Sequence, residues 1–311
     1  DRAVKAEVTK KALAVTGDEI IFASNTSTLP ITSLAAASDR PDNFIGLHFF
    51  SPVDRMPLVE IIMGEETSSE TLAKSIDYVK AIRKTPIVVK DARGFYTSRV
   101  FGTYVREGLA LLADGVSPAL IENAGKMAGM PVGPLAMADE VSIDLMYKIG
   151  KQTREDIGDE YVAVPGDDLV ATMVEDLGRV GKKAGKGFYD YPGKGSKHLW
   201  PGLTEYCPLA GEQPDVEEVK KRLIYIQSVE AVRCMEEGVI AEKRDVDVGS
   251  IMGWGFPPFR GGVLSLVDTI GIHEFVAECD HLAQSHGPRF TPSKLLRDMA
   301  ARGEGFYGKA A

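Results

Sequence analysis

The sequence predicts an α/β domain followed by an all-α part that contains two copies of one helical module. Over residues 1–91, short apolar runs alternate with amphipathic segments. This pattern is typical of strands and helices that alternate in an α/β layer with a largely parallel sheet. After Gly94 the strand signal fades and helical periodicity dominates. Sequence anchors that recur in the same order within the helical part indicate a duplication.

Hydrophobic periodicity and capping signals define the elements of the N-terminal domain. The predicted helices cover 2–15, 31–37 and 68–83, and the predicted strands cover 19–24, 44–50, 58–63 and 85–90. Val4, Val8, Ala12 and Leu13 form the apolar stripe of the first helix, and Ser68 or Ser69 suits the N-cap of the third. Because the chain lacks an initiator Met and starts inside a helical pattern, we expect a fragment whose upstream part is absent.

The region after residue 91 is predicted to be helical in two blocks. Helices are expected over 95–113, 118–128, 136–149 and 169–178, and again from Val216 onward. Between the blocks, the stretch 192–215 is rich in Pro and Gly, which favours a linker. The predicted domains are therefore 1–91, a first helical module at 92–191, a linker at 192–215 and a second helical module at 216–311.

The duplication is carried by matched anchors that keep their order. Those of the first module are Glu107 before Gly115-Val116, then Gly129-Met130-Pro131, then Gly185–Tyr189; those of the second are Glu230 before Gly238-Val239, then Gly255-Phe256-Pro257, then Gly303–Tyr307. Asp139 and Asp268 recur after the Pro/Gly loops, where we expect them to cap helices or bind backbone amides. Two such modules can pack as a pseudo-symmetric pair.

Composition excludes several classes of function. The apolar fraction of 44% and charged fraction of 26% are those of a soluble globular protein. A net charge of −9 argues against a nucleic-acid partner, which needs a basic surface. Three widely spaced cysteines fit reduced thiols in a cytoplasmic protein and provide no zinc motif. No segment is long enough to be an integral membrane span.

One histidine and one carboxylate stand out in adjacent apolar runs. His48 comes at the end of the run 44–50, and Glu60 lies within the run 58–63. In an open α/β sheet, a strand that leads into a His-bearing loop delivers a base to the crevice at the strand ends. If the two runs are neighbours, a carboxylate on one ring nitrogen would fix the tautomer and raise the basicity of the other. Spacing alone fits a structural pair equally well.

Four motifs resemble the 3-hydroxyacyl-CoA dehydrogenase family, and the resemblance covers nearly the whole chain. The motifs are the segments 23–30 (ASNTSTLP), 46–53 (GLHFFSPV), 56–62 (MPLVEII) and 84–91 (KTPIVVKD). A duplicated module with the sequence GFPPF at 255–259 is typical of the multifunctional members, in particular of the C-terminal half of the α-subunit in fatty acid β-oxidation. The resemblance implies the later part of a Rossmann-type dinucleotide-binding domain. It also implies NAD-dependent oxidation of (S)-3-hydroxyacyl-CoA to 3-ketoacyl-CoA.

The resemblance also assigns site residues. It implies that His48 is the catalytic base, that Glu60 orients it, and that Ser27 hydrogen-bonds the substrate oxygen. Without it, Ser27 would be interpreted as a helix cap near Pro30. Asn25 is implied to contact the nicotinamide end of the cofactor. Ser98 stands where the family usually has an Asn of the substrate site; its hydroxyl is shorter than an amide but still donates and accepts a hydrogen bond.

The phosphate-binding turn of a dinucleotide fold is missing from the sequence. Such a fold needs a Gly-rich turn after its first strand and an acidic residue about twenty positions later, and neither occurs before residue 20. The pattern GxGxxG at Gly303–Gly308 has no following helix, so we interpret it as a structural turn.

Partners and alternatives follow from the same resemblance. We expect an enoyl-CoA hydratase domain upstream in the same protein and a thiolase subunit as a partner. We also expect a homo-oligomer and a cytoplasmic location. An alternative is an inactive scaffold for oligomer or thiolase contacts, which would bind no NAD. Another NAD-dependent hydroxyacid dehydrogenase is a third reading, against which the Pro-flanked His segment and the duplicated module argue.

Overall fold

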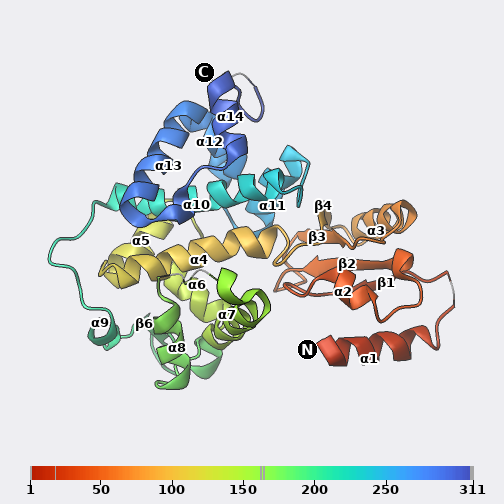
Figure 1. The fold of residues 1–311 in the computed structure, drawn as a ribbon. Helices are drawn as coiled ribbons and strands as arrows, with labels where there is room; N and C mark the ends of the chain where they lie inside the picture. The colour runs from red at the N-terminus through yellow and green to blue at the C-terminus, as the bar shows by residue number, and fades with distance from the viewer. Residues whose placement is uncertain (1, 18, 162, 164, 309–311) are drawn as a thin grey trace. The chain divides into compact units, whose positions relative to one another are not determined.

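The computed structural model describes residues 2–17, 19–161, 163 and 165–308 and divides into two compact units (Figure 1). The first unit comprises Asp1–Phe101 and Gln227–Ala311, and the second comprises Gly102–Ile226. Two long helices, α4 (Thr97–Ala113) and α10 (Val216–Glu236), contribute residues to both units. The compact units therefore divide the chain at different points from the predicted domains, inside helices rather than between elements.

The first unit is built on a four-stranded sheet with the order β1-β2-β3-β4. The strands are β1 (Phe22–Ser24), β2 (Phe44–Phe49), β3 (Leu58–Met63) and β4 (Thr85–Lys90). β1 and β2 are parallel, as are β3 and β4, but β2 and β3 are antiparallel. The connection from β2 to β3 is too short for a crossover helix, so the chain must reverse. The prediction of a largely parallel sheet thus holds with one antiparallel pair.

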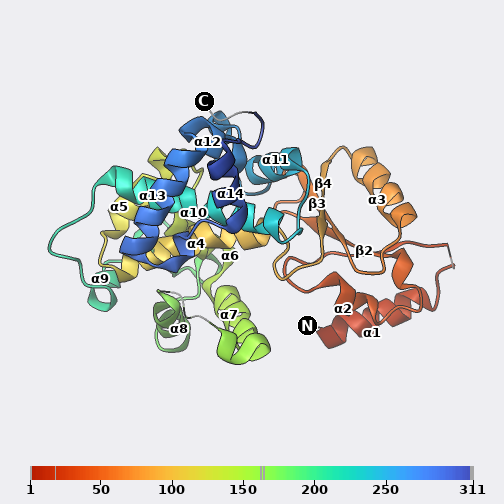
Figure 2. The ribbon, with the colours of Figure 1, turned by 45° about the horizontal axis from the view of Figure 1, so that its top comes forward.

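Alternate side chains of the sheet face different helices. Ile45 and Leu47 of β2 pack with Val59 and Ile61 of β3 against Val79 of α3 (Ser69–Ala81). Since side chains alternate along a strand, the even-numbered residues of β2 and β3 face the opposite side. Helices α1 (Arg2–Leu13) and α2 (Ile31–Ala35) lie on that side of the sheet in Figure 2.

The even-numbered face is closely packed. A Cβ atom added to Gly46 would come within 2.7 Å of the Ile31 side chain, so α2 lies directly on β2. On the same face, Gly253 of α11 (Lys243–Trp254) approaches the side chain of Leu58, where an added Cβ would lie at 3.0 Å. This is the face that carries His48 and Glu60.

The helices of the N-terminal region agree with the sequence, apart from the apolar stripe of the first. Ser68 caps α3, because its side chain accepts a hydrogen bond from the amide of Thr71. In α1, by contrast, Val4 and Val8 are 58% and 55% exposed, while Thr9 is buried. Of the predicted apolar stripe, Val4 and Val8 therefore face solvent and Ala12 and Leu13 are half-buried, because the helix turns its polar Lys5 and Thr9 toward the unit.

The second unit contains α5 (Pro118–Met127), α6 (Pro134–Val141), α7 (Ile143–Ile157) and α8 (Asp167–Glu175), with a hairpin of β5 (Tyr189–Asp190) and β6 (His198–Leu199). The single helix predicted over 136–149 is instead two. Ser142 lies between them with φ of 89°, a conformation that no helix residue adopts, so the chain turns there.

The predicted linker 192–215 packs within the second unit. It contains β6 and the short helix α9 (Leu203–Tyr206), and Leu203 is buried. The amide of Trp200 donates to the carbonyl of Phe188, and the amide of Ala210 donates to that of Gly115. Pro and Gly therefore shape a hydrogen-bonded segment here rather than a free tether.

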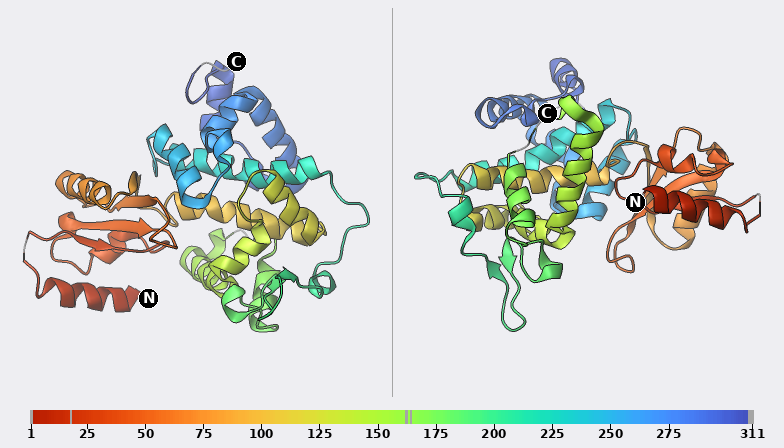
Figure 3. Two further views of the ribbon diagram at one scale, coloured as in Figure 1. Left: turned by 180° about the vertical axis from the view of Figure 1, so that it is seen from behind. Right: turned by 60° about the horizontal axis from the view of Figure 1, so that its bottom comes forward.

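The C-terminal part of the first unit is helical, as the sequence predicts. After α10 and α11 come α12 (Val263–Ile270), α13 (Ile272–His286) and α14 (Lys294–Arg302). Helices α13 and α14, drawn in blue, lie side by side in both views of Figure 3. Along the chain as far as it is described, no helix is both long and apolar enough to cross a membrane.

Aspartate carboxylates bind backbone amides at matched positions of the two modules, one of them buried and the other half-buried. Asp139 accepts from the amides of Phe188 and Tyr189, and Asp268 accepts from those of Phe306 and Tyr307. The prediction that these two aspartates bind backbone amides is confirmed. Burial raises the pKa of Asp139, although the amide donors oppose that effect. The GxGFY segments are thus structural turns that wrap a carboxylate.

A second pair of carboxylates caps helices in the same way. Glu122 accepts from the amides of Leu135 and Ala136 at the start of α6, and Asp247 accepts from those of Leu264 and Ser265 at the start of α12. A Cβ atom on Gly133 or Gly262 would collide with the respective carboxylate, at 2.5 and 2.4 Å. Glycine is required at these two positions because the carboxylate lies so close to the backbone. The duplication therefore includes the two glycines.

Two arginines show that the duplicated modules pair reciprocally. Each arginine of one module copy contacts two carboxylates of the other copy, and corresponding residues are separated by the same interval along the chain. The groups are Arg99 with Glu230 and Glu237, and Arg222 with Glu107 and Asp114. This exchange is the pattern of a two-fold interface, in which residue i binds j and j binds i.

The Asp139 turn provides a stability test. In Gly187→Ala the new Cβ would lie 2.0 Å from Asp139 Oδ1 and break the carboxylate's hydrogen bonds. We expect a loss of about 2 kcal/mol or more in the free energy of unfolding, measured by urea denaturation. Gly193→Ala, at an exposed position with no atom within 4 Å, is the matched control and should stay within about 0.5 kcal/mol of the parent. Equal stability of the two variants would contradict this account of the turn.

Candidate active site

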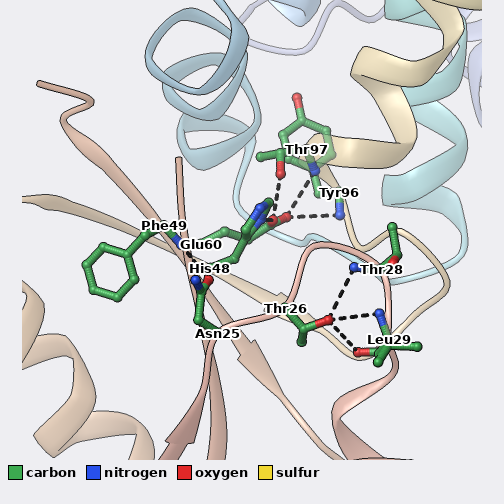
Figure 4. Close-up of polar contacts among 9 residues, drawn as sticks. All are labelled: Asn25, Thr26, Thr28, Leu29, His48, Phe49, Glu60, Tyr96 and Thr97. Atoms are coloured by element: carbon green, nitrogen blue, oxygen red, sulfur yellow. Dashed lines mark hydrogen bonds and ion pairs between the residues drawn. The ribbon is translucent and has the colours of Figure 1, made fainter. Parts of the chain in front are cut away.

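His48 and Glu60 meet on the even-numbered face of the sheet. They are register partners in the antiparallel β2–β3 pair, so both side chains project to the same side. Nδ1 of His48 lies 2.8 Å from Oε2 of Glu60 (Figure 4). His48 is 7% exposed and Glu60 is fully buried. The predicted contact is confirmed, but His48 lies within a strand rather than in a loop.

The other contacts of Glu60 come from the first turn of α4. Oε1 accepts from the amides of Tyr96 and Thr97, both at 3.0 Å, and Oε2 also accepts from the Thr97 hydroxyl at 2.6 Å. The positive end of the helix dipole stabilises an anion at this position. The two oxygens of Glu60 therefore face four hydrogen-bonding groups, of which His48 is one.

The backbone before α4 explains how these amides reach Glu60. Gly94 and Phe95 both adopt positive φ, at 74° and 51°. This conformation is rare for Phe, and its cost persists only where the surroundings impose it. Phe95 is fully buried, and its ring lies 6.4 Å from that of His48. The strained turn ends the loop and starts the helix at Thr97, two residues later than predicted, with its amides directed at the carboxylate.

The geometry fixes the tautomer of neutral His48. An ionised carboxylate only accepts hydrogen bonds, so Nδ1 carries the proton and donates to Glu60. In the neutral ring Nε2 is then the acceptor. The Phe50 ring, with its centroid 4.5 Å from that of His48, packs against the imidazole and fixes its orientation. The arrangement is that of a general base whose partner stabilises the imidazolium.

Asn25 lies at the carboxyl end of β1, beside the strand that carries His48. Its Oδ1 accepts from the amide of Phe49 at 3.2 Å (Figure 4). The Lys5 ammonium donates to the Asn25 carbonyl at 3.0 Å and to the Ser24 hydroxyl at 3.1 Å. The sequence analysis did not identify Lys5. The available signal was its place on the polar side of the amphipathic helix that precedes β1.

Ser27 is exposed in the turn that follows, and the hydrogen bonds of that turn involve a different residue. The Thr26 hydroxyl accepts from the amides of Thr28 and Leu29. The N-terminus of α2 is held by Asp91, whose carboxylate accepts from the amides of Ile31 and Thr32. The alternative reading of Ser27 as a helix cap is therefore wrong, and its hydroxyl is left at the surface near the strand ends.

Ser98 is half-buried in the first turn of α4, directly after Thr97. The structure thus places Ser98 one residue from the group that contacts Glu60. Ser27 and Asn25 lie at the end of β1, and Asn25 also contacts β2. The predicted residues therefore come from four places along the chain, and direct contact within the set is seen between His48 and Glu60.

A cavity of about 410 Å³ lies on the opposite, α3-facing side of the sheet. Its lining is apolar on the strands and polar on α3, and consists of Ile21, Ala23, Asn25, Leu47, Phe49, Lys74, Ser75 and Tyr78. Asn25 is the predicted site residue that it includes. Among the residues that the structure describes, no cluster of three or more His, Cys, Asp or Glu side chains is placed to hold a metal ion.

The polar groups at the end of β1 fit one end of a dinucleotide. The Asn25 carboxamide and the Lys5 ammonium offer hydrogen-bond donors at the end of β1, a type of group that suits the carboxamide and ribose of a nicotinamide nucleoside. The sequence up to residue 20 contains no Gly-rich turn of the kind that cradles a pyrophosphate. The donors at the end of β1 therefore match the nicotinamide end of the cofactor in chemical type.

Residues 1–92 match the sequence model of the 3-hydroxyacyl-CoA dehydrogenase NAD binding domain, and residues 94–191 match that of the family's C-terminal domain. The chain belongs to the 3-hydroxyacyl-CoA dehydrogenase family.

Curated relatives include the fatty acid oxidation complex subunit alpha of two Shewanella species. The protein of Shewanella amazonensis is 44% identical over 295 residues, which are 94% of this chain and 41% of the relative. That of Shewanella halifaxensis is 42% identical over 99% of this chain and 43% of the relative. The chain thus spans less than half the length of these relatives.

Solved structures agree on the fold. The 3-hydroxybutyryl-CoA dehydrogenase of Escherichia coli covers 97% of this chain and 79% of its own, with a TM-score of 0.81 at 22% identity. The dehydrogenase part of multifunctional enzyme 1 from C. elegans covers 96% and 69%, with a TM-score of 0.65 at 25% identity. The predicted fold class, an α/β nucleotide-binding domain followed by helical dehydrogenase modules, is confirmed.

The contacts of Glu60 predict a large effect on stability. Glu60→Ala would leave the buried amides of Tyr96 and Thr97 without their acceptor. We expect the free energy of unfolding to fall by about 3 kcal/mol or more, measured by urea denaturation. Glu66→Ala, at an exposed position of the same unit, is the control and should remain near the parent. A loss for Glu60→Ala no larger than that of the control would refute the capping of α4 by this carboxylate.

Proposed function

We propose that this chain carries the dehydrogenase chemistry of a longer β-oxidation enzyme, in which (S)-3-hydroxyacyl-CoA is oxidised to 3-ketoacyl-CoA with NAD. The observation that carries the proposal is the buried His48–Glu60 pair, with a 2.8 Å contact through Nδ1 that leaves Nε2 for a substrate hydroxyl. Membership of the 3-hydroxyacyl-CoA dehydrogenase family supports the substrate class. The names of the Shewanella relatives support a place in fatty acid oxidation.

His48 is the base of the proposed reaction. Its Nε2 accepts the proton of the 3-hydroxyl group, and the Glu60 carboxylate stabilises the imidazolium that forms. The hydrogen of the C3–H bond leaves as a hydride, which bound NAD would accept, and the electron pair of the O–H bond forms the C=O bond. The substrate thus loses two electrons and two protons, one of them carried by the hydride and the other held on Nε2 of His48. In the reverse direction the imidazolium returns its proton to the carbonyl oxygen.

Neighbouring polar groups are proposed to orient the reactants. Ser27, exposed beyond the end of β1, offers its hydroxyl to the substrate oxygen. Asn25, together with Lys5, holds the nicotinamide end of the cofactor beside His48. Ser98 takes the position of the family's Asn in the substrate site, where its shorter side chain needs a bridging water to span the same distance.

Partners and location are part of the same proposal. The relatives are named as one subunit of a complex, which supports a partner subunit for this protein, and a thiolase is the partner that we propose. A homo-oligomer and a cytoplasmic location complete the proposal. The three cysteines, Cys207, Cys234 and Cys279, are free and buried, which fits a reducing compartment.

Substitutions of His48 and Glu60 in the full-length protein test the mechanism. His48→Gln removes the base, and we expect turnover of 3-hydroxybutyryl-CoA to fall by about two to four orders of magnitude with the fold retained. Glu60→Gln presents an NH₂ group to Nδ1 and so favours the tautomer whose Nε2 is protonated. We expect a comparable loss, measured as NADH formation at 340 nm. His198→Gln, on the exposed β5–β6 hairpin, is the control and should be unaffected; near-normal turnover in His48→Gln would remove the proposed base.

NADH titration of the chain 1–311 separates an enzyme from a scaffold. The missing phosphate turn favours weak binding, but the polar groups at the end of β1 favour binding of the nicotinamide end. We expect a saturable fluorescence response in the millimolar range, weakened further by Asn25→Ala. If neither the parent chain nor the Asn25→Ala variant responds to NADH, the result favours the inactive scaffold.

A further inference from the structure

The acceptor atom that orients His48 also receives a hydroxyl. Oε2 of Glu60 lies 2.8 Å from His48 Nδ1 and 2.6 Å from Thr97 Oγ1. Thr97 is 1% exposed, and Glu60 is fully buried, so water does not compete for this oxygen. A neutral hydroxyl and a titratable imidazole therefore share one buried charge (Figure 4).

The hydroxyl is separate from the contacts that start α4. Those contacts are made by Oε1, which accepts from the amides of Tyr96 and Thr97 at 3.0 Å each. Helix capping by Glu60 therefore does not need the Thr97 side chain. Valine at this position would keep the β-branched shape and both amides while replacing the hydroxyl with a methyl group.

We propose that Thr97 is a positioning residue whose hydroxyl sets, through Glu60, the pH range in which His48 works as a base. The proposal rests on the assignment of His48 as the base in the proposed function. A hydrogen bond donated to Oε2 withdraws negative charge from the oxygen that faces the imidazole. Glu60 then stabilises the imidazolium less, and His48 remains neutral, and so able to accept a proton, at lower pH than it would beside an unshared carboxylate.

Two neighbouring titratable groups interact with the charge of Glu60, namely Tyr96, directly before α4, and Cys234 of α10. Burial raises the pKa of each, so both are neutral near pH 7. Asp247 of α11 and Tyr307 interact with Tyr96. Two charged groups lie further out: Lys5 of α1 contacts the end of β1, and Arg99 of α4 interacts with Cys234. All six are the same in the variants below.

The pH profile of kcat/KM for hydroxyacyl-CoA oxidation by the full-length protein tests the proposal. In Thr97→Val the acid limb should move to higher pH by about 0.5 to 1 unit, as expected for the loss of one hydrogen bond to a charged group. Thr97→Ser keeps the hydroxyl and should restore the parent profile. Thr67→Val is the matched control: it removes another buried threonine hydroxyl, one that donates to the Phe44 carbonyl, and should leave the midpoint unchanged.

A second measurement does not depend on turnover. In chain labelled at histidine, the ring resonance of His48 is assigned by its loss in His48→Gln, and its titration midpoint should rise in Thr97→Val. If Thr97→Val does not fold, Thr97→Ala also lacks the hydroxyl and takes its place. An unchanged midpoint in the hydroxyl-free variant, with activity merely lower at all pH values, overturns the proposal and leaves Thr97 as a packing residue.

The two proposals fail in different ways. Turnover that persists in His48→Gln, or a parent profile without an acid limb, defeats the proposed function, while the resonance of His48 still tests the effect of Thr97. Conversely, a normal acid limb that depends on His48 but does not respond to Thr97→Val defeats only the present inference.

Discussion

The hydrogen bonds of the Glu60 carboxylate are the interaction on which the candidate active site depends. It accepts from two backbone amides at the start of α4, from the Thr97 hydroxyl and from His48. One fully buried side chain thus ties a β-strand, a helix terminus and an imidazole together. A buried charge is tolerable only when it is satisfied in this way. The same donors that stabilise the fold therefore also fix the orientation and the tautomer of the proposed base.

Carboxylates that bind backbone amides are used repeatedly in this protein. Glu122 and Asp247, at matched positions of the two module copies, each cap a helix, and Asp139 and Asp268 each bind a GxGFY turn. Glycines are required beside these groups because a Cβ atom would displace the carboxylate. Together with the reciprocal arginine contacts, this conserves the geometry of the module in both copies although most of their side chains differ.

Much of the fold and part of the site were predictable from local patterns. The strands, most helices, the Ser68 cap and the amide-binding aspartates follow from periodicity and side-chain chemistry. The errors have non-local causes. The break at Ser142 depends on a left-handed residue that the apolar pattern does not reveal. The exposure of Val4 and Val8 depends on which side of α1 faces the rest of its unit. Lys5 and Thr97 lie near the site only because distant segments meet there.

The sequence by itself determined the class of elements, the duplication and the residue types of the proposed chemistry, because these depend on spacing along the chain. It offered His48 and Glu60 with two equally acceptable interpretations. The antiparallel register of β2 and β3 was decided by the tertiary structure, and with it the fact that both side chains project to one face. A shift of one residue would have placed them on opposite sides of the sheet. Tertiary structure also brought the first turn of α4 to the same carboxylate, since only folding joins groups that lie 37 residues apart.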